Sequence, residues 1–221
     1  MASWMVHLRV ADALLDQIDN IEPEPFIVGN LAPDSGIPND DWTTFTPSTS
    51  VSHFRPSGKK ADPFSFSKKY FTYNQRTQYS KKQFSFYLGY FTHLMTDVLW
   101  SSMVVYPSIE KHPEKATKDK NAFIWELKKD WYDLDFKYLR DHPGFRAFRL
   151  YSSSKGFQNT FMDEFSSTAF DDRRAYISDF YLSGRSGLDR EYNYLTEPEM
   201  DNFVQESVEK ILLHLKAESY I

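Results

Sequence analysis

The amino-acid sequence predicts an all-α protein, a helical bundle formed by a single domain that spans residues 1–221. Apolar residues recur at helical spacing in several long segments, whereas the alternation typical of strands is scarce and no internal repeat is visible. The chain has 221 residues and 17% aromatic residues. It is therefore long enough, and apolar enough, to bury a core of its own.

The first helix is expected to begin after Ser3, a good N-cap residue, and to run to about Asn20. One face of this helix carries residues at positions i, i+4, i+7 and i+11, namely His7, Ala11, Leu14 and Ile18. Residues at this spacing form a single stripe along a helix. His7 is therefore predicted to face the core together with the apolar residues.

A long irregular loop region is expected after the first helix. The sequence IEPEP should end that helix, and FIVGNLAPDSGIPNDDW is rich in the Gly, Pro, Asn and Asp residues that favour loops. Residues 36–82 are polar and irregular, with one or two helical turns expected around residues 64–73. A compact domain contains so long a stretch when it is functional or held in place by something else.

The later part of the chain is expected to be mostly helical. Residues 83–104 are apolar nearly all round, which is typical of a helix at the centre of a bundle. The sequence KHPEKATKDKN should form a solvated turn, and SGRSGLDR a flexible link. Thr196 and Glu199 form a capping box for the last helix. The other helices are expected at 122–141 and 171–182, and the last one ends near residue 217.

Composition excludes several classes of site. The chain has no cysteine, so disulfides and thiolate metal sites are impossible, and any metal must be held by His, Asp or Glu. The net charge of −5 argues against a surface that binds nucleic-acid phosphates, although a small basic patch in a cleft stays compatible with it. Neither a secretory signal nor an apolar run of about 18 residues is visible, so we expect a cytoplasmic protein without a transmembrane segment.

His93 and Asp97 are two ionisable residues on the apolar segment GYFTHLMTDVLW. Because they are four residues apart, they lie on one face of the predicted helix. Gly89 lies one turn earlier on that face, where its missing side chain leaves room for another backbone or for a ligand. Burying ionisable groups without partners is costly, so both side chains need partners.

Three further residues offer suitable chemistry, namely His7, Asp34 in NLAPDSG and His53 in SVSHF. Together with His93 and Asp97 they make three imidazoles and two carboxylates, a ligand set suited to zinc and other divalent transition metals. Other interpretations stay open. His93 and Asp97 can bond to each other or to backbone, His7 can be a satisfied core histidine, Asp34 a turn residue, and His53 a solvated side chain.

The sequence resembles the zinc-dependent phospholipase C family, whose superfamily also includes zinc-dependent single-strand nucleases. The ordered motifs that carry the resemblance are HLRVAD, NLAPDSG, SHF and YLGYFTHLMTDVLW. They cover the first half of the chain well and the second half loosely. The resemblance implies a helical fold of the phospholipase C and nuclease type that hydrolyses phosphate esters with a cluster of metal ions. It also assigns metal-ligand positions one by one to His7, Asp34, His53, His93 and Asp97.

Three departures from the family pattern bear on the number of ions. Trp4 is internal, whereas secreted members begin with a tryptophan whose amino group binds metal. The region where the family has a further histidine reads WSSMVVYP. In WYDLD, Trp131 stands where the family has another histidine, and Asp135 stands where it has a carboxylate. Asp135 is expected either to complete a second metal position, to orient a ligating histidine, or to belong to a solvated acidic run. We expect one or two ions rather than three.

The expected function is a metal-dependent hydrolase of phosphate esters, with phosphodiesterase or phospholipase C-like activity that acts through a metal-activated water. His93, Asp97, His53 and Asp34 are expected to hold the principal Zn²⁺, or another divalent transition metal. His7 joins them or shares Asp97 with a second ion. Asp34 is the expected acceptor of the proton from water. The expected substrate is a small phosphoester or phospholipid. The alternatives are a non-catalytic protein with a structural ion and a nuclease or nucleotide phosphatase.

Overall fold

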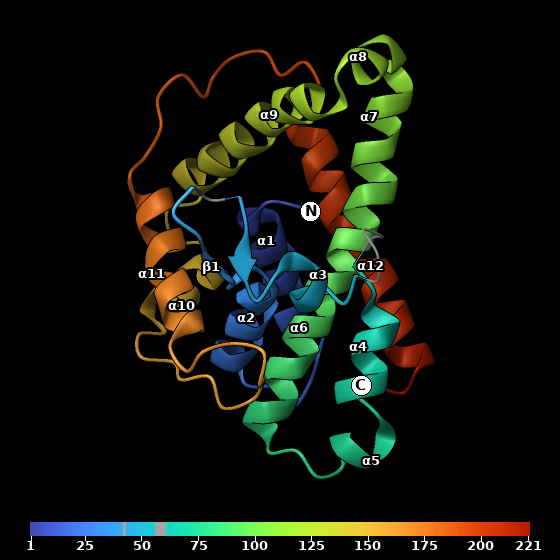
Figure 1. Ribbon diagram of the computed structural model, residues 1–221, viewed down its shortest axis with the longest axis vertical. Coiled ribbons are helices and arrows are strands. Elements are labelled where there is room, and N and C mark those ends of the chain that lie inside the picture. The colour runs from blue at the N-terminus through green and yellow to red at the C-terminus, as the bar shows by residue number, and fades with distance from the viewer. Residues whose placement is uncertain (42, 56–60) are drawn as a thin grey trace.

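A computed structural model describes residues 1–41, 43–55 and 61–221, and it confirms the all-α fold (Figure 1). The long helices are α1 (Trp4–Leu15), α2 (Pro23–Leu31), α6 (Lys81–Trp100), α9 (Lys120–Asp141), α11 (Ala169–Leu182) and α12 (Glu197–Ala217). The shorter helices are α3 (Thr49–Ser52), α4 (Pro63–Tyr70), α5 (Tyr73–Arg76), α7 (Tyr106–Lys111), α8 (Pro113–Lys118) and α10 (Arg146–Ser153). A 3-10 turn, η1 (Ala32–Asp34), follows α2, and a π-helical segment, η3 (Ser101–Val105), follows α6. Strands β1 (Ile37–Pro38) and β2 (Phe45–Thr46) form one short antiparallel pair in which Ile37 lies opposite Thr46.

The first helix is shorter than predicted, because α1 ends at Leu15 rather than near Asn20. Ser3 has the extended backbone of an N-cap residue, but its hydroxyl makes no capping bond. It donates instead to the carboxylate of Asp135, with 2.8 Å between the two oxygens. The predicted inward stripe of α1 is present, and His7 is fully buried on it. The start of the chain is therefore tied into the interior by a polar contact.

The prediction of a loop over FIVGNLAPDSGIPNDDW was wrong in its first part, because FIVGNL forms most of α2. Pro23 occupies the first turn of this helix, where the missing N–H costs nothing. Gly29 in the interior serves a helix contact rather than a turn, since a Cβ there would lie 2.1 Å from the carbonyl oxygen of Phe86 on α6. The other corrections concern shorter helices: KHPEKATKDKN contains α8, and α3, α7 and α10 were not predicted.

The helix α6 is the central element of the bundle and packs against α1, α2, α4 and α12. The predicted helix over residues 83–104 corresponds to α6 and the π-helical segment η3. Gly89 on α6 faces the backbone of α2, where a Cβ would lie 2.1 Å from the carbonyl oxygen of Phe26. Of the two roles expected for Gly89, the close approach of another backbone is the one found. The contact holds α2 against the face of α6 that carries His93.

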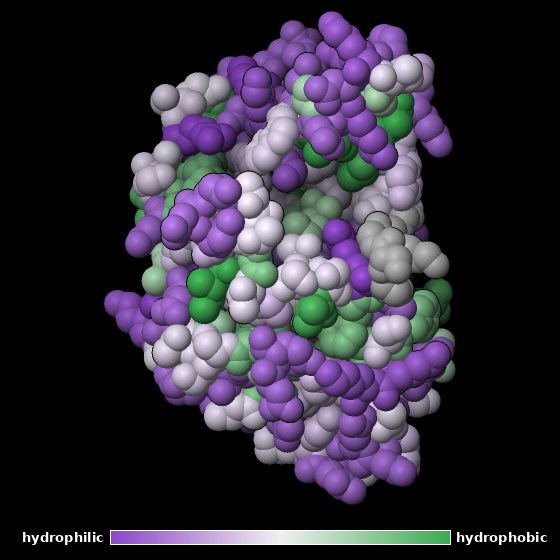
Figure 2. Space-filling view, viewed as in Figure 1, coloured by the Kyte–Doolittle hydropathy of each residue, from purple (hydrophilic) through white to green (hydrophobic). Residues whose placement is uncertain are grey.

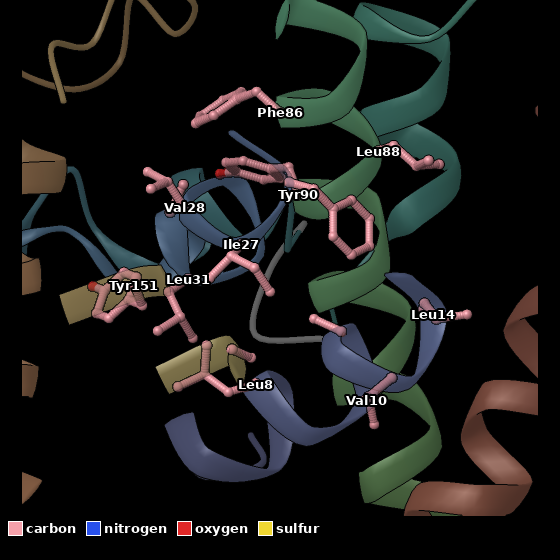
Figure 3. Close-up of a cluster of buried hydrophobic side chains, with 14 of the residues drawn as sticks. Leu8, Val10, Leu14, Ile27, Val28, Leu31, Phe86, Leu88, Tyr90 and Tyr151 are labelled. Carbon is pink, nitrogen blue, oxygen red and sulfur yellow. The ribbon is translucent and has the colours of Figure 1, made fainter. Parts of the chain in front are cut away.

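Two groups of buried apolar side chains form the core. The first lies between α1, α2 and α6 and includes Tyr151 of α10 (Figure 3). The second joins the end of α6 to α9 and α12, where Trp100 packs edge-on against Trp131 and Phe203. Thr196 and Glu199 form the predicted capping box at the start of α12. None of the helices in the described part of the chain is long and apolar enough to span a membrane.

The region after α2, which was expected to be irregular, is pinned to the bundle. The hydroxyl of Tyr90 on α6 donates to the carbonyl oxygen of Ser52, 2.5 Å away. The helix α4 confirms the helical turns expected around residues 64–73. Because α3 is fixed in this way, the residue that follows it, His53, is brought into the interior, where its side chain is fully buried.

Candidate metal centre

His93 and Asp97 lie one turn apart on α6, and both side chains are buried. The Nδ1–H group of His93 donates to the carbonyl oxygen of Asn30 at the end of α2, 2.7 Å away. A hydrogen bond of this kind fixes the orientation and the tautomer of an imidazole, so that Nε2 carries the free lone pair. The close contact between α2 and α6 thus prepares His93 as a ligand.

Asp34 and His53 reach the same place from the region after α2. Asp34 ends the 3-10 turn η1, and its Oδ2 accepts a hydrogen bond from Trp4 Nε1 at 3.0 Å. His53 follows α3, and its Nδ1 lies 2.9 Å from the hydroxyl of Ser52. One polar atom of each side chain is thus held by a neighbour, and the other polar atoms, Oδ1 of Asp34 and Nε2 of His53, lie 3.3 Å from each other. His53 is buried rather than solvated, which removes one of the open interpretations.

Five of the six predicted ligands come together and are called here the His–Asp cluster, which consists of His7, Asp34, His53, His93 and Asp97. Within it, ligand atoms lie within 4.8 Å of one another in two overlapping groups, His7 with His93 and Asp97, and Asp34 with His53 and His93. The residue common to both groups is His93. Sharing of Asp97 with a second ion, one of the two arrangements expected for His7, stays a prediction.

The contacts within the cluster are longer than typical hydrogen bonds, and their lengths suit groups that surround an ion. The Nε2 atom of His53 lies 3.3 Å from Asp34 Oδ1, 3.3 Å from His93 Nε2 and 3.5 Å from Asp97 Oδ2. The Nε2 atom of His7 lies 3.5 Å from Asp97 Oδ1. The rings of His7 and His93 are stacked, with their centroids 3.7 Å apart.

Protonation in the cluster favours metal binding. Burial, together with the neighbouring His7, lowers the pKa of His93 to about 3, so this imidazole is neutral near pH 7. Burial alone would raise the pKa of Asp34, but the hydrogen bond from His53 and the nearby imidazoles hold it well below its usual range. The pKa of Asp97 is also held low, because the chain's N-terminal amino group and His7 outweigh the effect of burial. Neutral imidazoles and ionised carboxylates are the forms that bind metals.

Unpartnered atoms show that the cluster fits a metal ion. Among the described residues, neither ring nitrogen of His7 has a hydrogen-bond partner, and Oδ2 of Asp97 has none. Buried polar groups are nearly always paired, and leaving one unpaired costs about 1–3 kcal/mol. His7 is therefore not a satisfied core histidine. Nitrogen and carboxylate ligands without sulfur match zinc and neighbouring divalent transition metals.

Asp135, the sixth predicted ligand, lies outside both groups. It is buried on α9, where its two oxygens accept hydrogen bonds from the hydroxyls of Ser3 and Tyr181, each 2.8 Å long. Burial raises the pKa of Asp135 to about 7 against the effect of these two bonds. The carboxylate is not part of a solvated acidic run. Its role as a metal ligand stays a prediction, and its observed contacts hold the start of α1.

Two contacts of the cluster with backbone groups were missed from the sequence. The backbone N–H of Ala2 donates to Oδ1 of Asp97 at 2.8 Å, and the carbonyl oxygen of Asn30 accepts from His93. Both partners are backbone groups, so their side chains carry no signal for these roles. The roles of Gly29 and Asn30 depend on the packing of α2 against α6, which the sequence does not specify.

A cleft of about 590 Å³ opens beside the cluster, and Asp34 lies in its wall. The cleft lies between the start of α1, the region after α2 and the helices α9 and α11, and Figure 2 shows a hollow on this face below α9. Aromatic rings and two cations stand in its walls, contributed by Trp4, Phe45, Trp125, Lys128, Trp131, Tyr132, Arg173 and Tyr176. Lys128 was not predicted as a site residue, because a lysine on an amphipathic helix normally marks its solvated face.

Comparison with known proteins agrees with this geometry. The family model of the zinc-dependent phospholipases C matches residues 6–177, which include all five residues of the His–Asp cluster and Asp135. No curated protein and no solved structure matches the chain. The matched range covers most of the chain and includes the whole His–Asp cluster. The chain therefore belongs to the zinc-dependent phospholipase C family.

Proposed function

We propose that the protein is a metal-dependent hydrolase of phosphate esters, with phospholipase C-like action on a phospholipid or a smaller phosphodiester. The family supports a zinc-dependent enzyme that acts on phospholipids. The observation that carries the proposal is the position of Asp34. It belongs to the His–Asp cluster, and it also lines the cleft. A substrate in the cleft would therefore meet the cluster directly.

The ion would be held by His53, His93 and Asp34, and Asp97 lies within 4 Å of the two histidines. His93 has one free lone pair, because its Nδ1 is committed to Asn30, so it can bind one ion at a time. We therefore infer one principal ion that uses His93. A second ion at His7 and Asp97 would lack His93, the third residue of that group, and would therefore be bound more weakly.

Hydrolysis requires a P–O bond to form with water and the P–O bond to the leaving alcohol to break. The water loses a proton, and the departing alcohol gains one. A bound divalent ion of this kind neutralises charge on the phosphoryl oxygens and lowers the pKa of water. Asp34 is the proton acceptor, because its side chain is 10% exposed and borders the cleft, whereas that of Asp97 is 3% exposed. Trp4 holds the Oδ2 atom of Asp34, which keeps the carboxylate aimed between the cluster and the cleft.

The experiment measures hydrolysis of bis-p-nitrophenyl phosphate, short-chain phosphatidylcholine and single-stranded DNA with zinc, manganese or nickel. We expect metal-dependent turnover of a phosphodiester or phospholipid and a loss of at least about 100-fold in D34N, the size of effect expected for a general base. D41N is the matched control, because Asp41 also lines the cleft but bonds only to Asn39 and Thr43 in the described structure. It should keep activity within about threefold.

The same assay separates the alternatives. Turnover of DNA without turnover of lipid would make the protein a nuclease. Metal binding without turnover of any of the three substrates would leave a structural ion that joins the region after α2 to α6, and it would contradict the proposed hydrolysis. Equal activity in D34N and the wild type, at equal metal content, would remove the role proposed for Asp34.

A further inference from the structure

In the cleft beside the His–Asp cluster, cationic side chains lie over aromatic rings. Nζ of Lys128 lies 4.4 Å from the ring centroid of Trp125, and the guanidinium carbon of Arg173 lies 5.5 Å from that of Tyr176. All four residues line the cleft. A quaternary ammonium group is bound by aromatic faces that are free to receive it. Here the protein's own cations already lie over two of these faces.

Lys128 is held in the cleft without a counterion. The side chain is half-buried on α9, and no carboxylate of the described residues lies within 4.0 Å of its Nζ. Two later cations of the same helix are paired, Lys137 with Glu197 and Arg140 with Asp189. An ammonium that has lost part of its water and has no anionic partner attracts an anion strongly.

The environment of Lys128 connects it to the cluster. Burial lowers the pKa of Lys128, and the negative charge of Asp34 acts against that shift. The ammonium of Lys128 is thus partly desolvated, and it interacts electrostatically with the carboxylate of Asp34, which lines the cleft. Arg173 is held by a hydrogen bond from its Nη2 to the carbonyl oxygen of Gly36, 2.5 Å away, and adds a second positive charge to the lining of the cleft. A ligand whose phosphate reaches Asp34 would lie in a cleft that both cations line.

On the basis of the proposed function, we propose that this cleft selects phosphoesters whose group beyond the scissile phosphate is anionic, and that Lys128 binds that group. The anionic group is a carboxylate or a further phosphate. A choline headgroup is disfavoured for two reasons. Its charge has the same sign as that of Lys128 and Arg173, and the face of Trp125 that would receive it is taken.

Binding of three soluble probes tests this selectivity without turnover. Phosphocholine, glycerol 3-phosphate and 3-phosphoglycerate share a phosphate and differ in carrying a cation, no charge or an anion beyond it. Calorimetry on the zinc-loaded protein should find 3-phosphoglycerate bound at least about 10-fold more tightly than phosphocholine, with glycerol 3-phosphate between them, since hydrogen bonds between charged groups have about this strength.

Charge reversal at Lys128 is the sharpest variant. K128E should reverse the order and bind phosphocholine best, whereas K128R should keep the wild-type order and shows that the site tolerates substitution. K129E is the matched control, since Lys129 is the next residue on α9 and is exposed on a different cavity. It should leave the order unchanged. A lysine with a purely structural role would weaken all three probes alike and would not reverse their order.

The outcomes distinguish this inference from the proposed function. If no phosphoester is hydrolysed but the binding order is as expected and reverses in K128E, selectivity stands and hydrolysis fails. If the protein hydrolyses phosphodiesters but binds phosphocholine as tightly as 3-phosphoglycerate, the inference is overturned while the function stands. Equal effects of K128E and K129E, or no binding of any probe, would also overturn it.

Discussion

His93 combines two properties that a metal ligand needs. Its Nδ1 atom is fixed by the carbonyl oxygen of Asn30, and burial keeps its pKa near 3. The imidazole therefore presents a neutral Nε2 in one orientation over the whole physiological range of pH. Asp97 lies beside it with one oxygen paired to the backbone of Ala2 and the other unpaired. In each residue one atom bonds to the backbone, and we propose that the other binds the ion.

Asp135 should make the stability of the metal-free protein depend on pH. Its pKa is about 7 in the folded protein and near 3.8 in the unfolded chain, so the folded state holds more protons between these values. Stability from this group is therefore present at low pH and is lost as pH rises towards 7. The variant D135N has no such titration. Relative to the wild type, its free energy of unfolding should rise by about 2–3 kcal/mol between pH 5 and pH 8.

Urea denaturation of both proteins at the two pH values, with a chelator present, measures this difference. The altered bonds to Ser3 and Tyr181 add an offset that is equal at both pH values, so the change of the difference with pH is the quantity that tests the prediction. A difference that does not change with pH would mean that Asp135 is already ionised in the folded protein at pH 5.

Among individual residues, those that contribute a side chain to the cluster were predictable from the sequence. The four-residue spacing of His93 and Asp97 places both on one helix face, and the motif residues His7, Asp34 and His53 are found beside them. The backbone partners were not predictable, because any residue supplies a carbonyl or an N–H. The position of Asp135 depends on which residue of α1 faces α9, and spacing along one helix does not contain that information.

The contact between helices α2 and α6 determines the orientation of His93 in the site. Gly29 and Gly89 let the two backbones approach until a Cβ on either would lie 2.1 Å from a carbonyl oxygen of the other helix. That approach brings the carbonyl of Asn30 to His93. Glycine usually weakens a helix by about 1 kcal/mol relative to alanine, so its presence twice at one contact indicates a packing requirement.

The variant G89A should therefore destabilise the protein although alanine favours helices. The added methyl group meets backbone atoms of Phe26 and Asn30, which cannot move aside as a side chain can. We expect a net loss of about 1–3 kcal/mol in the free energy of unfolding, as for other overpacked cores, and weaker zinc binding because Asn30 is displaced. Denaturant unfolding and a zinc titration measure the two effects.

G144A is the control for this prediction, since a Cβ at Gly144 meets no atom within 4 Å. It should change neither quantity. Wild-type stability together with wild-type zinc affinity in G89A would show that the spacing of α2 and α6 does not govern the site.

Elements with a strong apolar period were predictable, whereas α2 was not. The helices around His93 and in the C-terminal third were found close to their predicted limits, and the capping box at Thr196 begins α12 as expected. In α2, the prolines of its first turn and Gly29 were interpreted as loop signals. The same residue types serve a helix start and a close helix contact, and only the partner helix distinguishes the two uses.

For the whole molecule, the arrangement explains why a chain with a net charge of −5 keeps five ionisable groups together in its interior. They come from α1, from the region after α2 and from α6, so an ion between them would link three parts of the chain. Binding to the folded state alone stabilises a protein by about 2.7 kcal/mol when the ligand is at 100 times its dissociation constant. The resemblance to the phospholipase C family predicted this assembly, which the separate motifs could not place in space.

The central claim is that the His–Asp cluster holds a transition metal through His93. Anomalous diffraction at the zinc edge, from protein purified without added metal and then loaded with zinc, tests it most directly. We predict a peak about 2.0–2.1 Å from His93 Nε2, enclosed by His53, Asp34 and Asp97, together with loss of bound zinc in H93A and its retention in H142A, whose histidine is exposed. A map without a peak at His93, or a zinc content unchanged in H93A, would contradict the claim.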